Sequence, residues 1–261
     1  MRILFIGDIV GRHGRDLSKR GLAAIVDHHA IDFVIANAEN AAAGKGITRE
    51  IGDQLLEWGV DVTTSGNHVW DKKEALSYIG TEPRLLRPGN YPAGVPGNGS
   101  DLARTRHGET VGVINVMGRV FMLNIDDPFA VVMREVEAMR ERTRTIVVDF
   151  HAEATSEKIA MGWHLDGKVT AVIGTHTHVQ TADERVLPRG TAYITDLGMC
   201  GPYDGVIGRE KGPVLQRFLT QIPARFDVAT GDPRLCGAIA TVDARTGRAE
   251  KVERVMLCYN G

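Results

Sequence analysis

The sequence predicts an α/β fold built around a parallel sheet, and two observations indicate it. Short apolar runs alternate with amphipathic stretches of helical spacing through the first half of the chain. Strand–helix–strand alternation of this kind implies parallel strands joined by right-handed crossovers. A chain of 261 residues, of which 43% are hydrophobic, is also long enough to bury a substantial core.

The first half contains three strand–helix pairs followed by a loop. In the second helix, Ile51, Leu55 and Trp58 share one face, and Thr48 is a candidate N-cap. The segment 83–100 is rich in Pro, Gly and Asn, so it is either a lid or rim over a site or a surface connection. The predicted strands are 3–7, 32–37 and 61–65, and the predicted helices are 14–29, 48–58 and 71–79.

The second half combines apolar strands, amphipathic helices and a hairpin. In chain order we predict strands 102–106 and 111–116, helix 128–142, strand 145–150, helix 156–165, strands 169–173 and 192–195, and helix 213–219. The C-terminal segment predicts the hairpin strands 238–243 and 251–257, joined by the turn 244–248. Two half-sheets that face each other, with helices outside, accommodate a parallel first half and a hairpin-rich second half. No repeat or linker is visible, so we expect a single domain spanning residues 1–261.

Composition and charge narrow the class of protein. The formal net charge is −2, and no run of five basic residues occurs, which disfavours binding to duplex nucleic acid but not to a nucleotide-sized phosphate. Cys200, Cys236 and Cys258 are widely spaced and form no Cys-x-x-Cys pair, as expected of reduced cysteines in a cytoplasmic protein. No signal peptide and no membrane span are expected, because no apolar window approaches about eighteen residues.

Polar side chains of the metal-ligand type follow five predicted strands. The carboxyl ends of strands are where ligands bind in open α/β sheets, so we expect these segments to meet in one crevice. In an extended chain, His176 and His178 would lie on the same side, roughly 7 Å apart, and would suit one metal ion each. The residues are Asp8 after the first strand, Glu39 and Asn40 after the second, Asn67 and His68 after the third, His151 after strand 145–150, and His176 and His178 after strand 169–173.

The donor set predicts two metal ions. Carboxylates and an amide oxygen are hard ligands, whereas imidazole suits Zn, Fe, Mn or Ni. About seven ligands are too many for one ion, and two ions roughly 3.5–4 Å apart form the site class that clamps an in-line phosphoryl displacement. One carboxylate must then bridge the ions, and Glu39 is the candidate because it is central among the segments.

Each of these residues also has a simpler interpretation. Asp8 could cap the following helix, Asn40 could be a turn residue, and His151 could be a hydrogen-bonded core histidine. Each motif is weak by itself. The joint occurrence of ligand-type residues after five strands is what favours a metal site.

Taken in order, these motifs resemble those of the calcineurin-like metallophosphoesterases, and more closely those of the YmdB family of bacterial phosphodiesterases. The matching blocks are GDIVG at 7–11, NAENAAAGKG at 37–46, SGNHVWD at 65–71, DFHAEATSEK at 149–158 and Gly-x-His-x-His at 174–178. The resemblance covers nearly the whole chain. It implies a four-layer αββα sandwich, a di-metal centre that commonly holds iron or manganese, and activity on phosphodiesters, including 2′,3′-cyclic nucleotides.

Two positions depart from the general metallophosphoesterase pattern, and both departures are shared with the YmdB-like group. Val10 stands where the histidine of an Asp-x-His motif would be, and Glu39 replaces a bridging Asp. Asn40 is the candidate to supply the ligand that Val10 cannot. An amide oxygen makes the first metal position harder, which favours Mn or Fe over Zn, although Zn stays possible.

The resemblance also implies a catalytic or metal-binding role for each of these residues. A hydroxide that bridges the metals would attack phosphorus, and His68 would protonate the leaving oxygen, a contribution worth roughly 10²–10⁴-fold. The alternative is that His68 only positions the phosphate; Asp71 is a weaker candidate to orient its ring. The implied ligands are Asp8, Glu39, Asn40 and His178 for metal one, and Glu39, Asn67, His151 and His176 for metal two.

Two other functions remain open at this point. A phosphomonoesterase or nucleotidase would need extra cations near the phosphate, for which Arg12, Arg49 and Arg119 are candidates. A non-catalytic, metal-bound regulatory protein would not require His68. We expect a small phosphodiester or cyclic nucleotide as substrate, no duplex nucleic acid, no membrane and a possible homo-oligomer.

Overall fold

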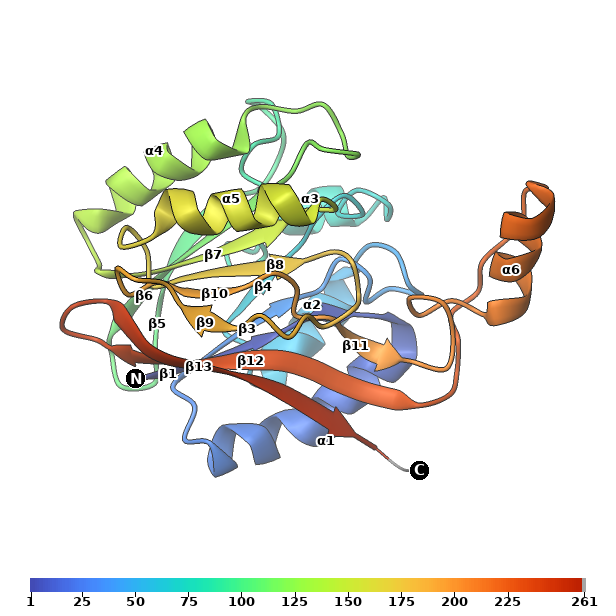
Figure 1. Cartoon of the computed structure of the whole chain (residues 1–261), viewed down its shortest axis with the longest axis horizontal. Coiled ribbons are helices and arrows are strands. Elements are labelled where there is room, and N and C mark those ends of the chain that lie inside the picture. The colour runs from blue at the N-terminus through green and yellow to red at the C-terminus, as the bar shows by residue number, and fades with distance from the viewer. Residues whose placement is uncertain (260–261) are drawn as a thin grey trace.

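Two β-sheets stack face to face, and helices cover their outer faces (Figure 1). The computed structural model describes residues 1–259. The first sheet has the strand order β2-β11-β12-β1-β3-β4, with β13 paired to β12, and the second has the order β5-β6-β7-β8-β10-β9. The strands of the first sheet are β1 (Arg2–Ile6), β2 (Asp8–Ile9), β3 (Phe33–Asn37), β4 (Val62–Thr64), β11 (Met199–Pro202), β12 (Pro233–Asp243) and β13 (Arg248–Cys258).

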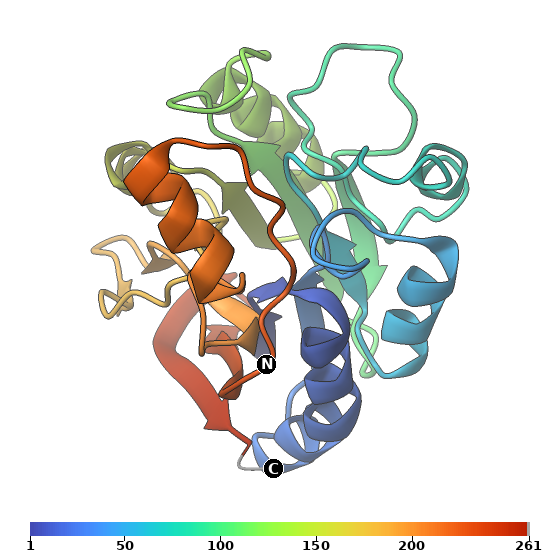
Figure 2. The same ribbon diagram turned by 90° about the vertical axis from the view of Figure 1, so that its right-hand side faces the viewer.

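The second sheet and the helices complete the layers. Figure 2 shows the layers from the side, where α4 lies above the two sheets and α1 lies below the sheets. The strands of the second sheet are β5 (Ser100–Arg104), β6 (Thr110–Met117), β7 (Thr145–His151), β8 (Ala171–Thr175), β9 (Arg185–Val186) and β10 (Ala192–Ile194). The helices are α1 (Gly11–His28), α2 (Arg49–Glu57), α3 (Ala75–Ile79), α4 (Pro128–Arg140), α5 (Thr155–Leu165) and α6 (Lys211–Thr220).

Three apolar clusters fill the three interfaces between these four layers. Ile3 and Phe5 of β1 point toward the second sheet and join a cluster with residues of β6, β7 and β8. Leu4 and Ile6 point the other way and pack against α1 and α2. A third cluster lies between the second sheet and α4 and α5. The alternation along β1 therefore buries both of its faces, and the predicted αββα sandwich is confirmed.

Strands β1, β3 and β4 of the first half are parallel, as predicted. Both sheets are mixed, however, so the prediction that the hairpin-rich second half forms a sheet of its own is wrong. In the second sheet, β6, β7, β8 and β10 are parallel, and antiparallel strands β5 and β9 close its edges. The C-terminal hairpin forms as predicted, but β12 pairs with β1 from Arg2↔Thr241 to Ile6↔Gly237. This pairing satisfies an edge of the N-terminal strand that would otherwise present unpaired backbone groups.

Other differences from the predicted elements are local. The helix predicted at 71–79 is confined to α3 (Ala75–Ile79), and the residues before it form turns. The helix predicted at 14–29 begins earlier, at Gly11. Strands β2, β9 and β11 are absent from the sequence prediction, because two to four residues are too few to show a period of two.

Helix α6 lies apart from the sheets and projects from the body of the molecule (Figures 1 and 2). Leu215, Phe218 and Leu219 on this helix are exposed to solvent. In residues 1–259 no helix is long and apolar enough to cross a membrane. All three cysteines are free, and Cys200 and Cys236 are buried.

A buried ion pair joins the helical layer to the carboxyl end of the second sheet. The ammonium of Lys158, on α5, donates a 2.6 Å hydrogen bond to Asp196, which follows β10. Both side chains are completely buried. Asp196 also accepts the backbone N–H groups of Thr177 and Gly198, at 3.0 and 2.8 Å. The pair therefore holds the turn that carries two of the predicted metal ligands.

Replacement of the lysine tests this role. Lys158→Met should lower the free energy of unfolding by about 3–5 kcal/mol, because it leaves Asp196 charged, buried and without its cation. Urea denaturation followed by circular dichroism measures the change. The control is Lys211→Met, which breaks the exposed pair between Lys211 and Asp204 and should cost less than about 1 kcal/mol. Equal losses in the two variants would contradict a structural role for the buried pair.

Candidate metal centre

A cleft of about 380 Å³ lies at the carboxyl ends of the parallel strands, where the sequence predicts the site. The predicted ligands reach it from β2, from the loops after β3, β4 and β8, and from the end of β7. Segment 83–100 does not supply its wall. The cleft is lined by Glu39, Asn40, Lys45, His68, Glu153, His176, Thr177, His178, Ile207, Arg209 and Phe226.

Glu39 lies at the centre of the predicted ligands. Its Oε1 is 3.2 Å from Nε2 of His151 and accepts a 3.2 Å hydrogen bond from the amide of Asn40. Its Oε2 accepts the backbone N–H of His68 at 2.9 Å. The side chain is buried. One carboxylate thus contacts residues of both predicted metal positions, which is the arrangement that a bridging ligand requires.

Three acceptor atoms converge on His151 at the second metal position. Its Nε2 lies 3.1–3.2 Å from Oε1 of Glu39, Oδ1 of Asn67 and Nδ1 of His176. A single N–H cannot serve three acceptors at once. Glu39, His151 and His176 also place one ligand atom each within 4.8 Å of one another. The donor set fits a cation that prefers oxygen and imidazole.

Buried groups behind His151 fix the orientation of its ring. Nδ1 of His151 is 2.9 Å from the hydroxyl of Thr175, and that hydroxyl donates to Asp149 at 2.7 Å. The hydroxyl accepts from Nδ1–H, so Nε2 is the nitrogen left to face the cluster. Asp149 and Thr175 are not among the predicted site residues. Asp149 is the only charged residue of the predicted strand 145–150, and this is the signal that could have identified it, whereas Thr175 gives no such signal.

Asp8, Asn40 and His178, the residues predicted for the first metal position apart from Glu39, lie close together. Nε2 of His178 is 3.2 Å from the amide nitrogen of Asn40 and 3.8 Å from Oδ1 of Asp8. Nδ1 of His178 donates to the carbonyl of Ile207 at 3.0 Å, which directs Nε2 toward the cleft. The oxygen and nitrogen of an amide exchange places by a 180° rotation, so Asn40 can present either atom.

One buried oxygen in this cluster has no hydrogen-bond partner among residues 1–259. Oδ1 of Asp8 makes no hydrogen bond, although Oδ2 accepts the backbone N–H of His176 at 3.1 Å. A fully buried carboxylate oxygen without a partner is costly unless a cation meets it. The predicted residues therefore fit a metal ion at the first position as well.

The segment 176–178 is not extended, so the premise used to separate the two histidines is wrong. Strand β8 ends at Thr175, and His176 and His178 have φ values of 102° and 65°. The turn still directs the two rings to different partners. His176 contacts His151 through Nδ1, and its Nε2 is 3.0 Å from Glu153, whereas His178 contacts Asp8 and Asn40. Glu153 is not among the predicted residues, and it orients the ring of His176.

The pKa values follow from the burial of these groups beside one another. Burial raises the pKa of Glu39, but the charge and hydrogen bond of His151 outweigh it and lower the pKa to about 2. Burial lowers the pKa of His151, but Glu39 and Asp8 outweigh it and raise the pKa to about 9. Burial raises the pKa of Asp8 to about 6, against the charge of His178, and lowers the pKa of His176 to about 3. A metal ion must therefore compete with a proton on His151.

His68 lies in the cleft wall. Its Nδ1 is 3.0 Å from the carboxylate of Asp71, three residues further along the turn, so this carboxylate orients the ring. Gly66 lets the loop lie close to the ligands, because a Cβ at this position would lie 2.1 Å from the His151 ring and 2.5 Å from Oε2 of Glu39. A residue larger than glycine would displace both side chains.

The basic side chains that line the cleft are not the arginines that the sequence suggests as phosphate-binding candidates. Lys45 and Arg209 line it, and neither follows a predicted strand closely enough to be identified from the sequence. Arg49 instead donates to Thr81 and lies over the ring of Tyr78, and Arg119 pairs with Asp127. These two candidates are therefore occupied elsewhere.

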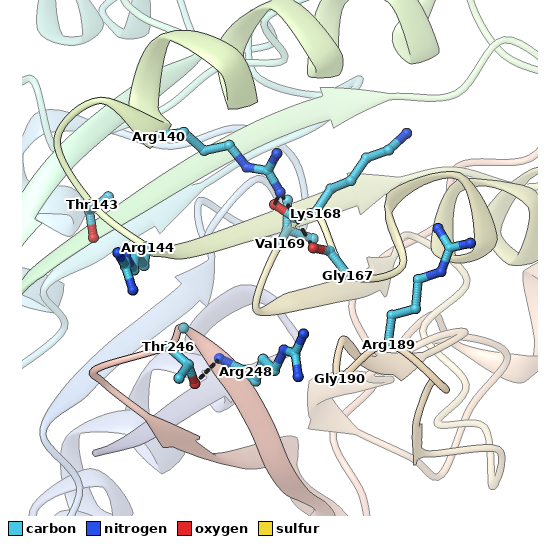
Figure 3. Close-up of a pocket in the computed structure, with 11 residues that line it drawn as sticks. Arg140, Thr143, Arg144, Gly167, Lys168, Val169, Arg189, Gly190, Thr246 and Arg248 are labelled. Carbon is cyan, nitrogen blue, oxygen red and sulfur yellow. Dashed lines mark hydrogen bonds between the residues drawn. The ribbon is translucent and has the colours of Figure 1, made fainter.

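A second depression, of about 370 Å³, lies at the amino-terminal ends of β7, β8 and β10 (Figure 3). Its basic side chains include Arg140, Lys168, Arg189 and Arg248, and no carboxylate, histidine or cysteine is among its lining residues. It offers no metal ligand. The cleft around Glu39 is therefore the candidate site.

Comparison with known proteins agrees with this geometry. A family model described as YmdB-like protein matches residues 4–255. A Bacillus subtilis protein named 2′,3′-cyclic-nucleotide 2′-phosphodiesterase is 49% identical over 257 residues, which cover 98% of this chain and 97% of the relative.

Two solved structures share the fold over its whole extent. A hypothetical protein from Thermus thermophilus is 42% identical, with a TM-score of 0.93 and 100% coverage of both chains. A structure described as a novel phosphatase from Mycoplasma pneumoniae is 35% identical, with a TM-score of 0.92 and coverage of 99% of this chain and 93% of the other. The chain belongs to the YmdB-like protein family.

Proposed function

We propose that this protein is a metal-dependent phosphodiesterase that hydrolyses 2′,3′-cyclic nucleotides at the 2′ bond. The observation that carries the proposal is the cleft in which Glu39 contacts residues of both metal positions, beside the unpaired Oδ1 of Asp8. The similarity to the B. subtilis relative supports the class of substrate. Hydrolysis adds water to phosphorus, breaks the bond between phosphorus and the 2′ oxygen, and leaves a 3′-phosphate.

Two metal ions, iron or manganese in preference to zinc, are the proposed cofactors. Asp8, Asn40 and His178 would hold the first, Asn67, His151 and His176 the second, and Glu39 both. When bound, the ions supply Lewis acidity that neutralises phosphate charge and activates water. The mixed carboxylate, amide and imidazole set suits these metals.

His68 is the proposed general acid. Its Nδ1 is held by Asp71, so Nε2 is the atom that would give a proton to the departing 2′ oxygen. Lys45 and Arg209 would pair with the phosphate oxygens that do not react. The product, a single nucleotide with a 2′-hydroxyl and a 3′-phosphate, would then leave through the open cleft.

A phosphomonoesterase is the second candidate, and the presence of Lys45 and Arg209 in the cleft wall favours it. A monoester carries more negative charge than a diester and needs such cations. A non-catalytic metal protein is the third candidate, but the orientation of His68 by Asp71 serves no metal ligation. The diester is preferred because of the relative's name.

Three further expectations stay predictions. The cytoplasmic location rests on cysteine usage and on the sequence prediction of no signal peptide and no membrane span. The single domain is predicted for 1–261, of which residues 260 and 261 lie outside the described part. For a homo-oligomer, the exposed apolar side chains of α6, among them Phe218 and Leu219, are the surface that a second copy would cover.

The function is tested by comparing substrates. With Mn²⁺, the protein should convert 2′,3′-cyclic AMP to 3′-AMP and hydrolyse bis-p-nitrophenyl phosphate at least about tenfold faster than p-nitrophenyl phosphate, because a site that acts on a cyclic diester stabilises the transition state of a diester better than that of a monoester. Chromatography and absorbance measure the products. A preference for the monoester would favour the phosphatase, and no hydrolysis of either substrate would favour the non-catalytic protein.

Metal stoichiometry tests the two positions without reference to activity. Equilibrium dialysis against Mn²⁺ should give about two ions per chain, and His178→Ala should keep about one, because it removes the imidazole of the first position only. His107→Ala is the control, since His107 is on the surface beside Asp32, and it should bind as wild type does. Unchanged binding in His178→Ala would contradict the assignment.

His68→Ala separates catalysis from metal binding. We expect kcat on 2′,3′-cyclic AMP to fall by about 10²–10⁴-fold while the bound Mn²⁺ is unchanged, because the acid is lost and the ligands remain. Asp71→Asn should cause a smaller loss, since it only weakens the orientation of the ring. A rate within about threefold of wild type in His68→Ala would rule out the acid role.

A further inference from the structure

A second, larger hollow adjoins the metal cleft. We call it the basic trough; it measures about 510 Å³, and its lining includes the cationic side chains of Arg12, Lys45, Lys72, Arg209 and Arg225. Asp227 is the one carboxylate among its lining residues. The whole chain carries a formal net charge of −2, so this concentration of positive charge is local.

These cations come from separate parts of the chain and have few counter-charges. Arg12 begins α1, Lys45 and Lys72 lie in two loops, and Arg209 and Arg225 flank α6. Within residues 1–259, Arg12 pairs only with the half-exposed Asp16, at 3.5 Å, and Arg225 only with Asp227, at 3.2 Å. In the described residues, no carboxylate lies within ion-pair distance of Lys45, Lys72 or Arg209. Like charges gathered in this way repel one another, and a bound polyanion relieves the repulsion.

The trough and the cleft are continuous. Lys45, Arg209 and Phe226 line both of them. A ligand whose reacting phosphate lies in the cleft can therefore extend into the trough. Phe226, a residue that is 38% exposed, lines both hollows, and aromatic side chains are surfaces on which bases stack.

We propose that the trough binds the nucleotides that precede a 2′,3′-cyclic phosphate at the 3′ end of single-stranded RNA. This inference rests on the proposed function and extends its substrate from mononucleotides to oligoribonucleotides. Water adds to phosphorus, the bond to the 2′ oxygen breaks and that oxygen takes a proton, so the product is the same strand with a 2′-hydroxyl and a 3′-phosphate. Duplex nucleic acid is not the expected ligand, because the formal net charge of −2 disfavours it.

The arrangement of the cations favours a strand over a free nucleotide with more phosphates. Cations spread over two adjoining hollows, with an aromatic residue that lines both, are the combination by which proteins hold single strands. A compact polyphosphate would need its cations around one point, whereas Arg12 and Arg225 belong to the trough alone and not to the cleft.

The experiment compares two substrates that share the reacting group. These are 2′,3′-cyclic AMP and a tetra-adenylate that ends in a 2′,3′-cyclic phosphate, both assayed with the Mn²⁺-loaded protein. At low salt the KM of the tetranucleotide should be at least about tenfold lower, and added NaCl should narrow the difference, because contacts with phosphates release counterions. The double variant Arg12→Ala, Lys72→Ala should raise the KM of the tetranucleotide about tenfold and leave the kinetics on 2′,3′-cyclic AMP unchanged.

A matched control separates the trough from general positive charge. Arg248→Ala removes an exposed arginine from the depression of Figure 3, at the opposite edge of the second sheet. It should change neither KM. If Arg248→Ala raised the KM of the tetranucleotide as much as the double variant Arg12→Ala, Lys72→Ala does, the strand would be attracted by positive charge in general and not by the trough. That result would overturn the proposal.

The outcomes also distinguish this inference from the proposed function. Equal KM values for the two substrates in the wild-type protein would overturn the proposal that the trough binds RNA. The proposed function would still hold in that case, provided that 2′,3′-cyclic AMP is hydrolysed. If neither substrate is hydrolysed, fluorescence anisotropy with labelled tetra-adenylate 3′-phosphate decides. Weaker binding to the double variant than to the wild type supports the trough, and equal binding overturns it.

Discussion

The buried carboxylate of Asp149 is the contact on which the geometry of the metal centre depends. It lies on β7 of the second sheet and accepts hydrogen bonds from Thr64 on β4 and Asn37 on β3, both in the first sheet. On its own sheet it accepts from Thr175. Burial raises the pKa of Asp149, and these donors oppose the rise. The two sheets are thus held together directly beneath the ligands, so their relative position also sets the distances between ligands from different sheets.

Charge in the centre is balanced by close partners and not by solvent. Glu39 is buried and ionised because His151 and the backbone N–H of His68 compensate for lost hydration. Asp8 is buried with less compensation, and its pKa is raised accordingly. A buried charge without a partner is costly, so a cation bound among these carboxylates and imidazoles would stabilise them.

The turn 176–178 shows how strain is sustained at the site. Two non-glycine residues with positive φ cost of order 1–3 kcal/mol each unless the surroundings hold them. Here Asp8 accepts the N–H of His176, Asp196 accepts that of Thr177, and the carbonyl of Ile207 accepts from the ring of His178. Lys158 holds Asp196 in turn. The same contacts that stabilise the turn direct the ring of His176 to His151 and the ring of His178 to Asp8 and Asn40.

The sequence by itself determined the α/β class, most strands and helices, and the residues that converge at the strand ends, from Asp8 to His178. It did so because burial imposes a local period on apolar residues, and because ligands gather where parallel strands end. Only the tertiary structure decided that β12 completes the N-terminal sheet, that the His176 turn is left-handed, and that Lys45, Arg209 and Phe226 join the cleft to a basic trough. These features arise from contacts between segments that are far apart in the sequence, such as the pairing of Arg2 with Thr241. Local periodicity carries no information about such contacts.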